Sequence, residues 1–261
     1  PRTLAMTAYG DLDASIIDEL PKGRGGIETI IVPEEKRAQV MEKIIKECAR
    51  GRQSYWVCPL IEESEEFNFQ AAESTYIFLK ETLQQLNIGL VHGKLSSAKK
   101  IKAMENFKNG NTDVLVATTV IEVGVDVANS SVMVIENAER LGLTQLHQLR
   151  GRIGRGKHKS LCILIYKKPL SSIAKERLAA IRATNDGFVI AEKDLQLRGP
   201  GELLGTRQKG LIGLRIADIM RDAYLLPAIN KLTVNIEENH PDVIEKIVRR
   251  WVGDQLEYRN V

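Results

Sequence analysis

The sequence predicts a doubly wound α/β domain followed by a smaller, mostly helical C-terminal module. Three short segments, 113–119, 131–137 and 161–166, are continuously apolar. Continuous rather than alternating apolarity is typical of strands buried on both faces of a parallel sheet. Amphipathic segments with helical spacing alternate with the apolar runs, which is the element order of a doubly wound fold. Hydrophobic residues make up 43% of the chain and charged residues 27%, ordinary values for a globular protein.

The α/β domain is expected at 36–167. Before it, residues 1–35 contain many turn-forming residues and one short β-rich run at 26–33, so we interpret this segment as a connector. The remaining elements of the domain are expected as a helix over 35–50, a strand over 54–60, a helix over 69–86, a strand over 88–93 and a helix from Ser96 or Ser97 to Phe107.

The pattern changes after Pro169. Residues 171–183 and about 216–251 are amphipathic with helical spacing, and a glycine-rich, basic section lies between them at 198–210. We therefore predict a boundary near 168, with 168–261 forming the C-terminal module.

Charge is distributed unevenly along the chain. The net charge is only +3, but residues 141–215 contain 15 Lys and Arg against 5 Asp and Glu. Such an asymmetry fits either a polyanionic partner or a solvated basic surface. No run of 18 apolar residues predicts a membrane-spanning helix, and the N-terminus does not have the pattern of a signal peptide. The three cysteines are far apart and the four histidines lack ligand spacing, so we expect a reducing, cytoplasmic location and no metal site.

The most distinctive motif is QLHQLRGRIGRG at 145–156. It contains two arginines, Arg152 and Arg155, each directly after a glycine. A spacing of three residues lets both guanidinium groups project from one side of a helix end, and arginine is suited to bidentate contact with phosphate. An arginine that reaches a γ-phosphate across an interface is worth roughly 10³–10⁵ in rate. A basic helix end with surface ion pairs is the structural alternative.

A second motif, LVATTVIEVGVDV at 115–127, runs from an apolar strand into Thr118 and Thr119 and then reaches Gly124 and Asp126. Hydroxyl and backbone N–H groups at the end of a parallel strand are well placed to hold a phosphate, and Asp126 could accept hydrogen bonds from a ribose hydroxyl. A strand, a turn and a capping aspartate would look the same, so this segment alone leaves its role open.

These segments resemble the conserved motifs of superfamily 2 helicases. QLRGRIGR (148–155) is similar to motif VI, TTVIEVGVDV (118–127) to motif V, and VHGKLSSAKKIKAMENFKNG (91–110) to the motif IV region. The resemblance implies a second RecA-like motor domain. It also implies that Gly124, Asp126 and Gln148 face the nucleotide, whereas Thr118 and Thr119 face either the nucleotide or the nucleic-acid backbone.

Within this superfamily, the chain resembles the RecG family of branched-DNA helicases over nearly its whole length. NDGFVIAEKDLQLRGPGELLGTRQ (185–208) is similar to the TRG segment, which in that family couples the nucleotide state to movement of duplex DNA. The resemblance implies coupling or DNA-contacting roles for Arg182, Arg198, Arg207 and Gln208. The transcription-repair coupling factor has a related segment and is one alternative, although Thr206-Arg207-Gln208 fits RecG. A non-catalytic nucleic-acid-binding module is another.

Two motifs that hold ATP and Mg²⁺ are not found in the sequence, namely GxxxxGK[ST] and a DExH/D box. The resemblance therefore implies that ATP and Mg²⁺ are held mainly by a first motor domain that precedes this chain, along with a wedge domain. We expect Arg152 and Arg155 to complete that site, this chain to be inactive in ATP hydrolysis when alone, and the intact protein to remodel replication forks and Holliday junctions.

Overall fold

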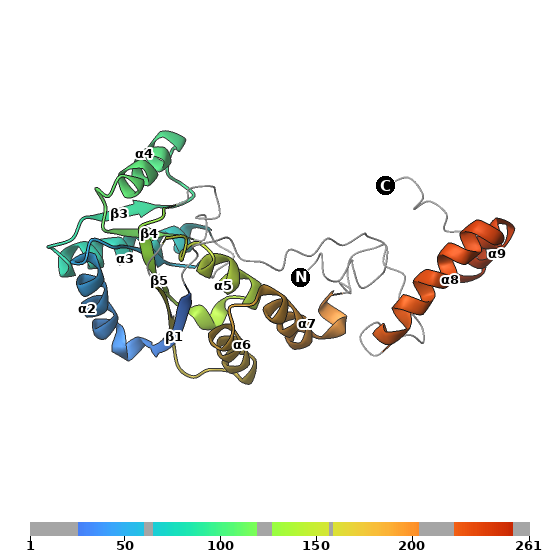
Figure 1. The fold of residues 1–261 in the computed structure, drawn as a ribbon. Helices are drawn as coiled ribbons and strands as arrows, with labels where there is room; N and C mark the ends of the chain where they lie inside the picture. Colours follow the sequence, from blue (N-terminus) through green and yellow to red (C-terminus); the bar gives the residue numbers. More distant parts are fainter. Residues whose placement is uncertain (1–25, 60–64, 119–126, 157–158, 204–221, 253–261) are drawn as a thin grey trace. The chain divides into compact units, whose positions relative to one another are not determined.

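The computed structural model describes residues 26–59, 65–118, 127–156, 159–203 and 222–252 (Figure 1). The chain divides into two compact units, and the larger one ends at Asp194. None of the helices in these ranges is both long and apolar enough to cross a membrane.

The larger unit contains a six-stranded sheet. Its strands are β1 (Ile27–Pro33), β2 (Gln53–Val57), β3 (Ile88–Val91), β4 (Val114–Ala117), β5 (Ser130–Ile135) and β6 (Ser160–Tyr166). They lie in the order β1-β6-β5-β2-β4-β3, and every neighbouring pair is parallel. All residues of β2, β4 and β5 are buried, as the continuous apolar runs predict.

Helices connect β1 to β2, β2 to β3, β3 to β4 and β5 to β6, and further helices follow β6. Their bounds are α2 (Arg37–Cys48), α3 (Glu65–Thr82), α4 (Ser97–Lys108), α5 (Leu143–Arg150), α6 (Ser172–Ala183), α7 (Gly187–Leu203), α8 (Leu226–Asn239) and α9 (Pro241–Val252), with short 3₁₀ turns η1 (Glu34–Lys36), η3 (Ala138–Arg140) and η4 (Ala223–Leu225). The α8 and α9 helices contact each other and belong to the smaller unit.

Both faces of the sheet are covered by helices. Trp56 of β2 packs in one cluster with side chains of α2 and α3, whereas the ring of its neighbour Tyr55 lies 4.8 Å from the ring of Phe107 on α4. Successive side chains of a strand point to opposite faces, so α4 lies across the sheet from α2 and α3. This arrangement confirms the predicted doubly wound fold (Figure 1).

The first strand lies within the segment that the sequence assigns to a connector. Ile27–Pro33 pairs with β6 along its whole length, from Ile27 opposite Ser160 to Pro33 opposite Tyr166. The sheet therefore begins at residue 27 and not after residue 35. As an edge strand, β1 has one neighbour and is mostly half-buried, so it lacks the continuous apolar signal of the central strands.

The C-terminal limit of the sheet-bearing unit also differs from the expected position near 168. The α6 helix contacts β1, η3 and α5, and the compact unit extends to Asp194, within α7. The change of pattern at Pro169 thus marks the end of the strands, whereas helices continue to pack against the sheet. Arg198, which we expected beside a glycine-rich loop, lies inside α7, because that helix continues to Leu203 through the first glycines of the section.

Candidate functional site

The arginine pair lies in the turns that follow α5. Gly142 precedes this helix, and its N–H donates to Oε1 of Gln145 at 3.0 Å. The helix ends at Arg150. Between the two arginines, Ile153 is fully buried, whereas Arg152 is half-buried and Arg155 is exposed. Ile153 therefore fixes the turn in the core, and Nε of the exposed Arg155 donates to the carbonyl of Gly151 at 3.4 Å.

Two glycines allow this turn to form. Gly154 has a φ of +79°, a left-handed conformation that side chains with a Cβ rarely adopt. At Gly156, a Cβ atom would lie 2.4 Å from the carbonyl oxygen of Ala128, closer than a carbon and an oxygen can approach. The loop with Arg155 is thus in direct backbone contact with Ala128.

The same contact places the arginine turn at one edge of the sheet. Ala128 precedes β5, and the next residue, Asn129, accepts a hydrogen bond through its carbonyl from the N–H of Gln53, the first residue of β2. Gly156 therefore lies at the edge formed by the amino ends of the strands. Thr118 follows the last residue of β4 and lies at the opposite, carboxyl edge.

At the carboxyl edge, Thr118 lies beside His92, which follows β3. The N–H of Thr118 donates to the carbonyl of Val91 at 3.3 Å. The hydroxyl of Thr118 and Nδ1 of His92 are both buried and have no hydrogen-bond partner within the described part of the chain. Burial lowers the pKa of His92, which favours the neutral imidazole, whereas Glu73, whose Oε1 lies 3.6 Å from Nε2 of His92, acts in the opposite direction. This edge therefore contains two buried polar atoms that lack partners among the described residues.

The other residues singled out from the sequence are dispersed. Gln148 is exposed on α5, and Arg182 is exposed in the last turn of α6. Predictions for Thr119, Gly124, Asp126, Arg207 and Gln208 lie outside the described residues. The structure thus brings Arg152 and Arg155 together in one turn and places Thr118 at the other edge.

Sequence reasoning missed a buried arginine in the same motif. Arg150 is 2% exposed, and its Nη1 donates to the carbonyls of Ile181 at 2.6 Å and Thr184 at 2.9 Å. Burial lowers the pKa of Arg150, although a guanidinium stays charged at neutral pH. In the reverse direction, Arg177 of α6 donates to the carbonyls of Glu139 and Leu141, both at 3.0 Å. Arg150 thus joins α5 to the C-terminal end of α6, and Arg177 joins α6 to η3 and Leu141, in both cases through backbone oxygens.

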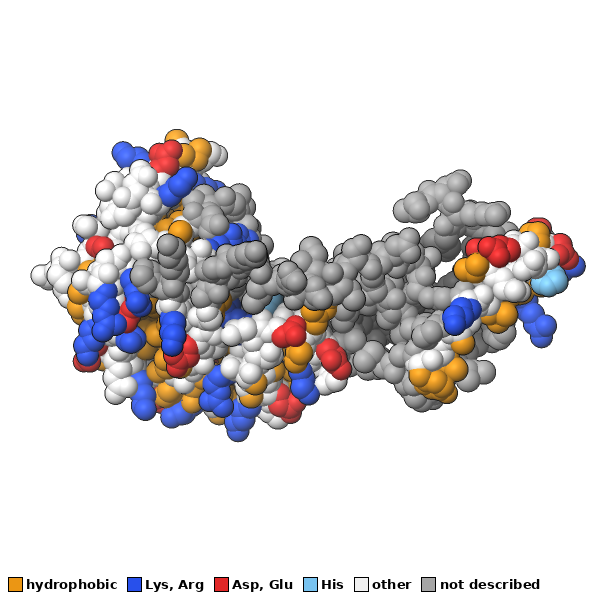
Figure 2. Space-filling view, in the orientation of Figure 1, with side chains coloured by type: hydrophobic (Ala, Val, Ile, Leu, Met, Phe, Trp, Pro, Cys, Tyr) orange, Lys and Arg blue, Asp and Glu red, His pale blue; other side chains and the backbone are white. Residues whose placement is uncertain are grey.

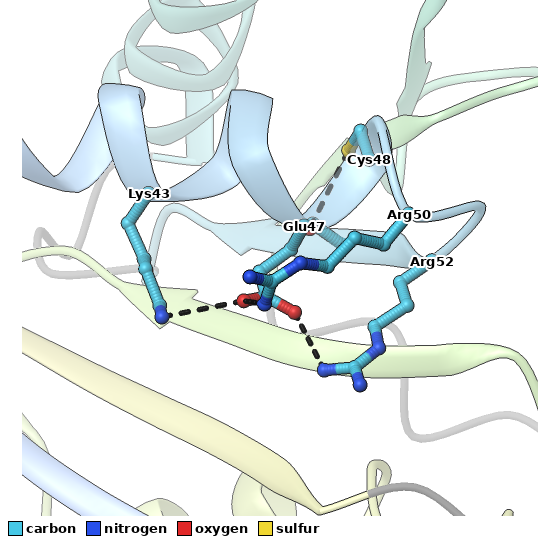
Figure 3. A network of polar contacts seen from close by, with 6 residues as sticks. Lys43, Glu47, Cys48, Arg50 and Arg52 are labelled. Atoms are coloured by element: carbon cyan, nitrogen blue, oxygen red, sulfur yellow. Dashed lines mark hydrogen bonds and ion pairs between the residues drawn. The ribbon is translucent and has the colours of Figure 1, made fainter.

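A second polar cluster, also not predicted, closes the connection between α2 and β2 (Figure 3). The buried carboxylate of Glu47 accepts contacts from Lys43 at 3.2 Å, Arg50 at 3.0 Å and Arg52 at 2.5 Å. Burial alone would raise the pKa of Glu47, but the hydrogen bond from Lys43 and the three positive charges hold it below its ordinary value. Lys43 and Arg50 are largely exposed, so the cluster stabilises the end of α2 and leaves positive charge at the surface.

Cations are not confined to the motif region. Figure 2 shows Lys and Arg side chains spread over the visible face of the sheet-bearing unit, with acidic side chains between them. Among the described residues, no group of three His, Cys, Asp or Glu side chains could hold a metal ion.

Comparison with known families places two matches along the chain. The family described as "Helicase conserved C-terminal domain" matches residues 35–157, and the one described as "ATP-dependent DNA helicase RecG, domain 3, C-terminal" matches residues 184–251. The first match contains Thr118 and the arginine turn, and the second begins at the junction of α6 and α7.

Individual proteins match over the whole chain. The ATP-dependent DNA helicases RecG of Haemophilus influenzae and Escherichia coli K12 are each 54% identical to it over 261 residues. The protein of the same name from Bacillus subtilis is 46% identical over 237 residues, which cover 90% of this chain and 35% of that protein. The chain spans 38% of the length of the first two relatives.

Among solved structures, one described as RecG bound to a three-way DNA junction is similar to this chain. It has a TM-score of 0.67 and 45% sequence identity, and the match covers 87% of this chain and 29% of that one. The similarity in fold therefore accompanies a similarity in sequence at the same residues.

Proposed function

The chain belongs to the RecG family and matches the C-terminal part of its members, and on this premise we propose that it is the second motor domain of an ATP-dependent DNA helicase. In the intact protein, this domain drives translocation on duplex DNA and the remodelling of branched DNA such as replication forks and Holliday junctions. The observation that carries the proposal is the accessible arginine pair, Arg152 and Arg155, on a turn fixed by buried Ile153.

The two arginines act on ATP bound by a preceding motor domain. A planar guanidinium donates two parallel hydrogen bonds to phosphate oxygens, so it stabilises the charge that develops when the γ-phosphoryl group is transferred. ATP bound with Mg²⁺ supplies that group. The guanidinium groups of Arg152 and Arg155 fit the role of phosphate binders, and in this proposal Mg²⁺ is held mainly by the preceding domain. Gln148, Gly124 and Asp126 complete the nucleotide face in this proposal.

The carboxyl edge of the sheet contacts the DNA backbone. Its position across the sheet from the arginine turn supports this assignment of Thr118 and the following Thr119. A hydroxyl that donates to a phosphate oxygen positions DNA without reading its sequence. Arg182, Arg198, Arg207 and Gln208 then belong to the part that couples ATP turnover to movement of the duplex.

The division into a connector, a motor domain and a C-terminal coupling module remains our functional prediction for the chain. A preceding motor domain and a wedge domain of the same polypeptide are its proposed partners. A cytoplasmic location is proposed as well, since DNA is the proposed substrate and Cys48, Cys58 and Cys162 are all free thiols.

The test uses the intact protein with Arg155→Ala and, separately, Arg152→Ala. We expect ATP turnover stimulated by a three-way junction to fall by about 10³-fold or more, as for loss of an arginine that stabilises the transition state. The affinity for ATP should change much less, because the arginines act mainly in the transition state. Turnover is measured by phosphate release, and ATP affinity by binding of a fluorescent analogue. Normal turnover in Arg155→Ala would exclude this role for the arginine.

A further inference from the structure

A tight turn in front of β5 supports the arginine turn. It comprises residues 127–130, which we call the support turn, and the carbonyl of Ala128 in it faces Gly156. A Cβ at Gly156 would lie 2.4 Å from that carbonyl oxygen, so the two backbones are in direct contact. Arg155 directly precedes Gly156. The position of the support turn therefore limits where the guanidinium group of Arg155 can lie.

One side chain of the support turn, Asn129, bonds to the loop between α2 and β2. Its Nδ2 donates to the carbonyl of Gly51 at 2.7 Å and makes a longer hydrogen bond, of 3.5 Å, to Oε1 of Gln53. The backbone carbonyl of Asn129 accepts the N–H of Gln53 at 3.1 Å. The support turn is thus held to this loop by both the side chain and the backbone of the same residue.

Gln53 is the buried end of this network. It is 3% exposed, and its Nε2 donates to the carbonyls of Phe107 at 2.5 Å and Thr112 at 2.7 Å, at the connection between α4 and β4. Because both carbonyls can only accept, the amide nitrogen faces them and the amide oxygen faces Asn129. A buried amide oxygen needs a donor, and Asn129 supplies it. The support turn is thereby joined to two neighbouring connections at the amino edge of the sheet.

These bonds are not those of an ordinary turn-forming residue. Asparagine and aspartate are common in turns because their side chains bond to nearby backbone groups. Asp186 has this local role, since its Oδ1 accepts the N–H of Phe188, two residues later, at 2.8 Å. The amide of Asn129 instead bonds to residues that precede it by 78 and 76 positions. Its side chain therefore holds the support turn in place and does not merely form it.

We propose that Asn129 is a positioning residue for ATP hydrolysis. Its bonds to Gly51 and Gln53 hold the carbonyl of Ala128 in place, and this carbonyl sets the position of Arg155. The inference rests on the proposed function of the arginine pair. In this scheme Asn129 acts through Arg155 alone and contacts neither ATP nor DNA. Its effect should therefore appear in the rate of hydrolysis, where Arg155 stabilises the transition state, and not in the binding of ATP.

The first test is Asn129→Asp in the intact protein. This substitution keeps the size of the side chain but replaces the donor by a carboxylate oxygen, which would repel the oxygens of Gly51 and Gln53. A misplacement of about 1 Å can cost about 10²-fold in rate, so we expect turnover at saturating ATP and junction DNA to fall by about 10-fold or more. The affinity for ATP, measured with a fluorescent analogue, should stay within about two-fold of the wild type.

Two further variants serve as comparisons. Asn106→Asp makes the same change of charge on the exposed surface of α4, so it should leave both turnover and ATP affinity unchanged. Asn129→Ala removes the donor without adding a repulsive oxygen, and the backbone carbonyl can still accept the N–H of Gln53. Turnover of Asn129→Ala should therefore fall by only about three-fold, the effect of one lost hydrogen bond.

A double-mutant cycle separates the positioning of Arg155 from general structural damage. In protein that already carries Arg155→Ala, Asn129→Asp should lower the rate further by less than about two-fold, because the group that it positions is gone. The rates are measured as single turnovers with the protein in excess over ATP. A contact that is merely structural would lower the rate by the same factor with and without Arg155.

Three results would overturn the inference. Turnover of Asn129→Asp could equal that of Asn106→Asp, the affinity for ATP could fall as much as turnover, or the loss could multiply with that of Arg155→Ala. Failure of the proposed function gives a different result, since Arg155→Ala alone would then leave turnover normal.

Discussion

The contact between Gly156 and Ala128 predicts a large effect of one methyl group on ATP turnover. In Gly156→Ala, the added Cβ would lie 2.4 Å from the carbonyl oxygen of Ala128, and contacts below 3.0 Å are essentially never found. Both groups belong to backbone near the arginine turn, so the loop must move by at least about 0.6 Å. A misplacement of about 1 Å can cost about 10²-fold in rate, so we expect turnover to fall by about 10–100-fold. Overpacking should also lower the free energy of unfolding by about 1–3 kcal/mol.

The assay is phosphate release by the intact protein at saturating ATP and DNA, together with urea unfolding to measure stability. Gly26→Ala is the matched control, because a Cβ there meets nothing within 4 Å and its φ is ordinary. Its turnover and stability should equal those of the wild type within about 0.5 kcal/mol. Turnover of Gly156→Ala within two-fold of the control would refute the argument that this contact positions Arg155.

Further predictions concern three other positions. Thr118→Val removes a buried hydroxyl without a partner among the described residues, so it should raise the free energy of unfolding by about 1 kcal/mol while weakening DNA binding in a filter or anisotropy assay. A lower free energy of unfolding together with unchanged DNA binding would contradict the assignment of Thr118 to the edge that contacts DNA. Glu47→Gln should lower the free energy of unfolding by about 1–3 kcal/mol at neutral pH in urea titrations. The folded-state pKa of Glu47 lies below its ordinary value of 4.5. The difference in unfolding free energy between the wild type and Glu47→Gln should therefore be complete well above pH 4.5 and disappear as the pH falls through the folded-state pKa. A difference that does not depend on pH would be inconsistent with the ion pairs. Gly154→Ala should lower the free energy of unfolding by about 1–2 kcal/mol, because φ is +79° at this position. An unchanged melting temperature of this variant would argue against backbone strain.

The central strands could be predicted from the sequence because hydrophobicity alone identifies them. The runs at 113–119, 131–137 and 161–166 correspond to β4, β5 and β6, which are buried on both faces. The order of the strands could not be predicted, because it depends on which helix crosses which face. The sequence indicates only a connector with a short β-rich run at the position of β1, because an edge strand is half-buried and its signal is weak.

The arginine pair was evident from the sequence, but its surroundings were not. Arg152 and Arg155 lie beside glycines, a local pattern, whereas the close approach of Gly156 to Ala128 joins residues far apart in the chain. The buried contacts of α5 with the elements that follow it have no local pattern either. Thr144, His147 and Arg150 have the spacing of any exposed helix face, and only the packing of α6 and α7 gives them buried partners. A buried arginine beside two exposed ones has no distinguishing sequence signal.

The central claim is that this chain supplies the arginines of an ATP site whose phosphate-binding and metal-binding groups lie on another domain. The most direct measurement is ATP hydrolysis by residues 1–261 alone, purified and shown to be folded by circular dichroism, beside the intact protein under the same conditions with junction DNA. We predict that the intact protein turns over ATP and that the isolated chain does not. Hydrolysis by the isolated chain at the rate of the intact protein would contradict the account.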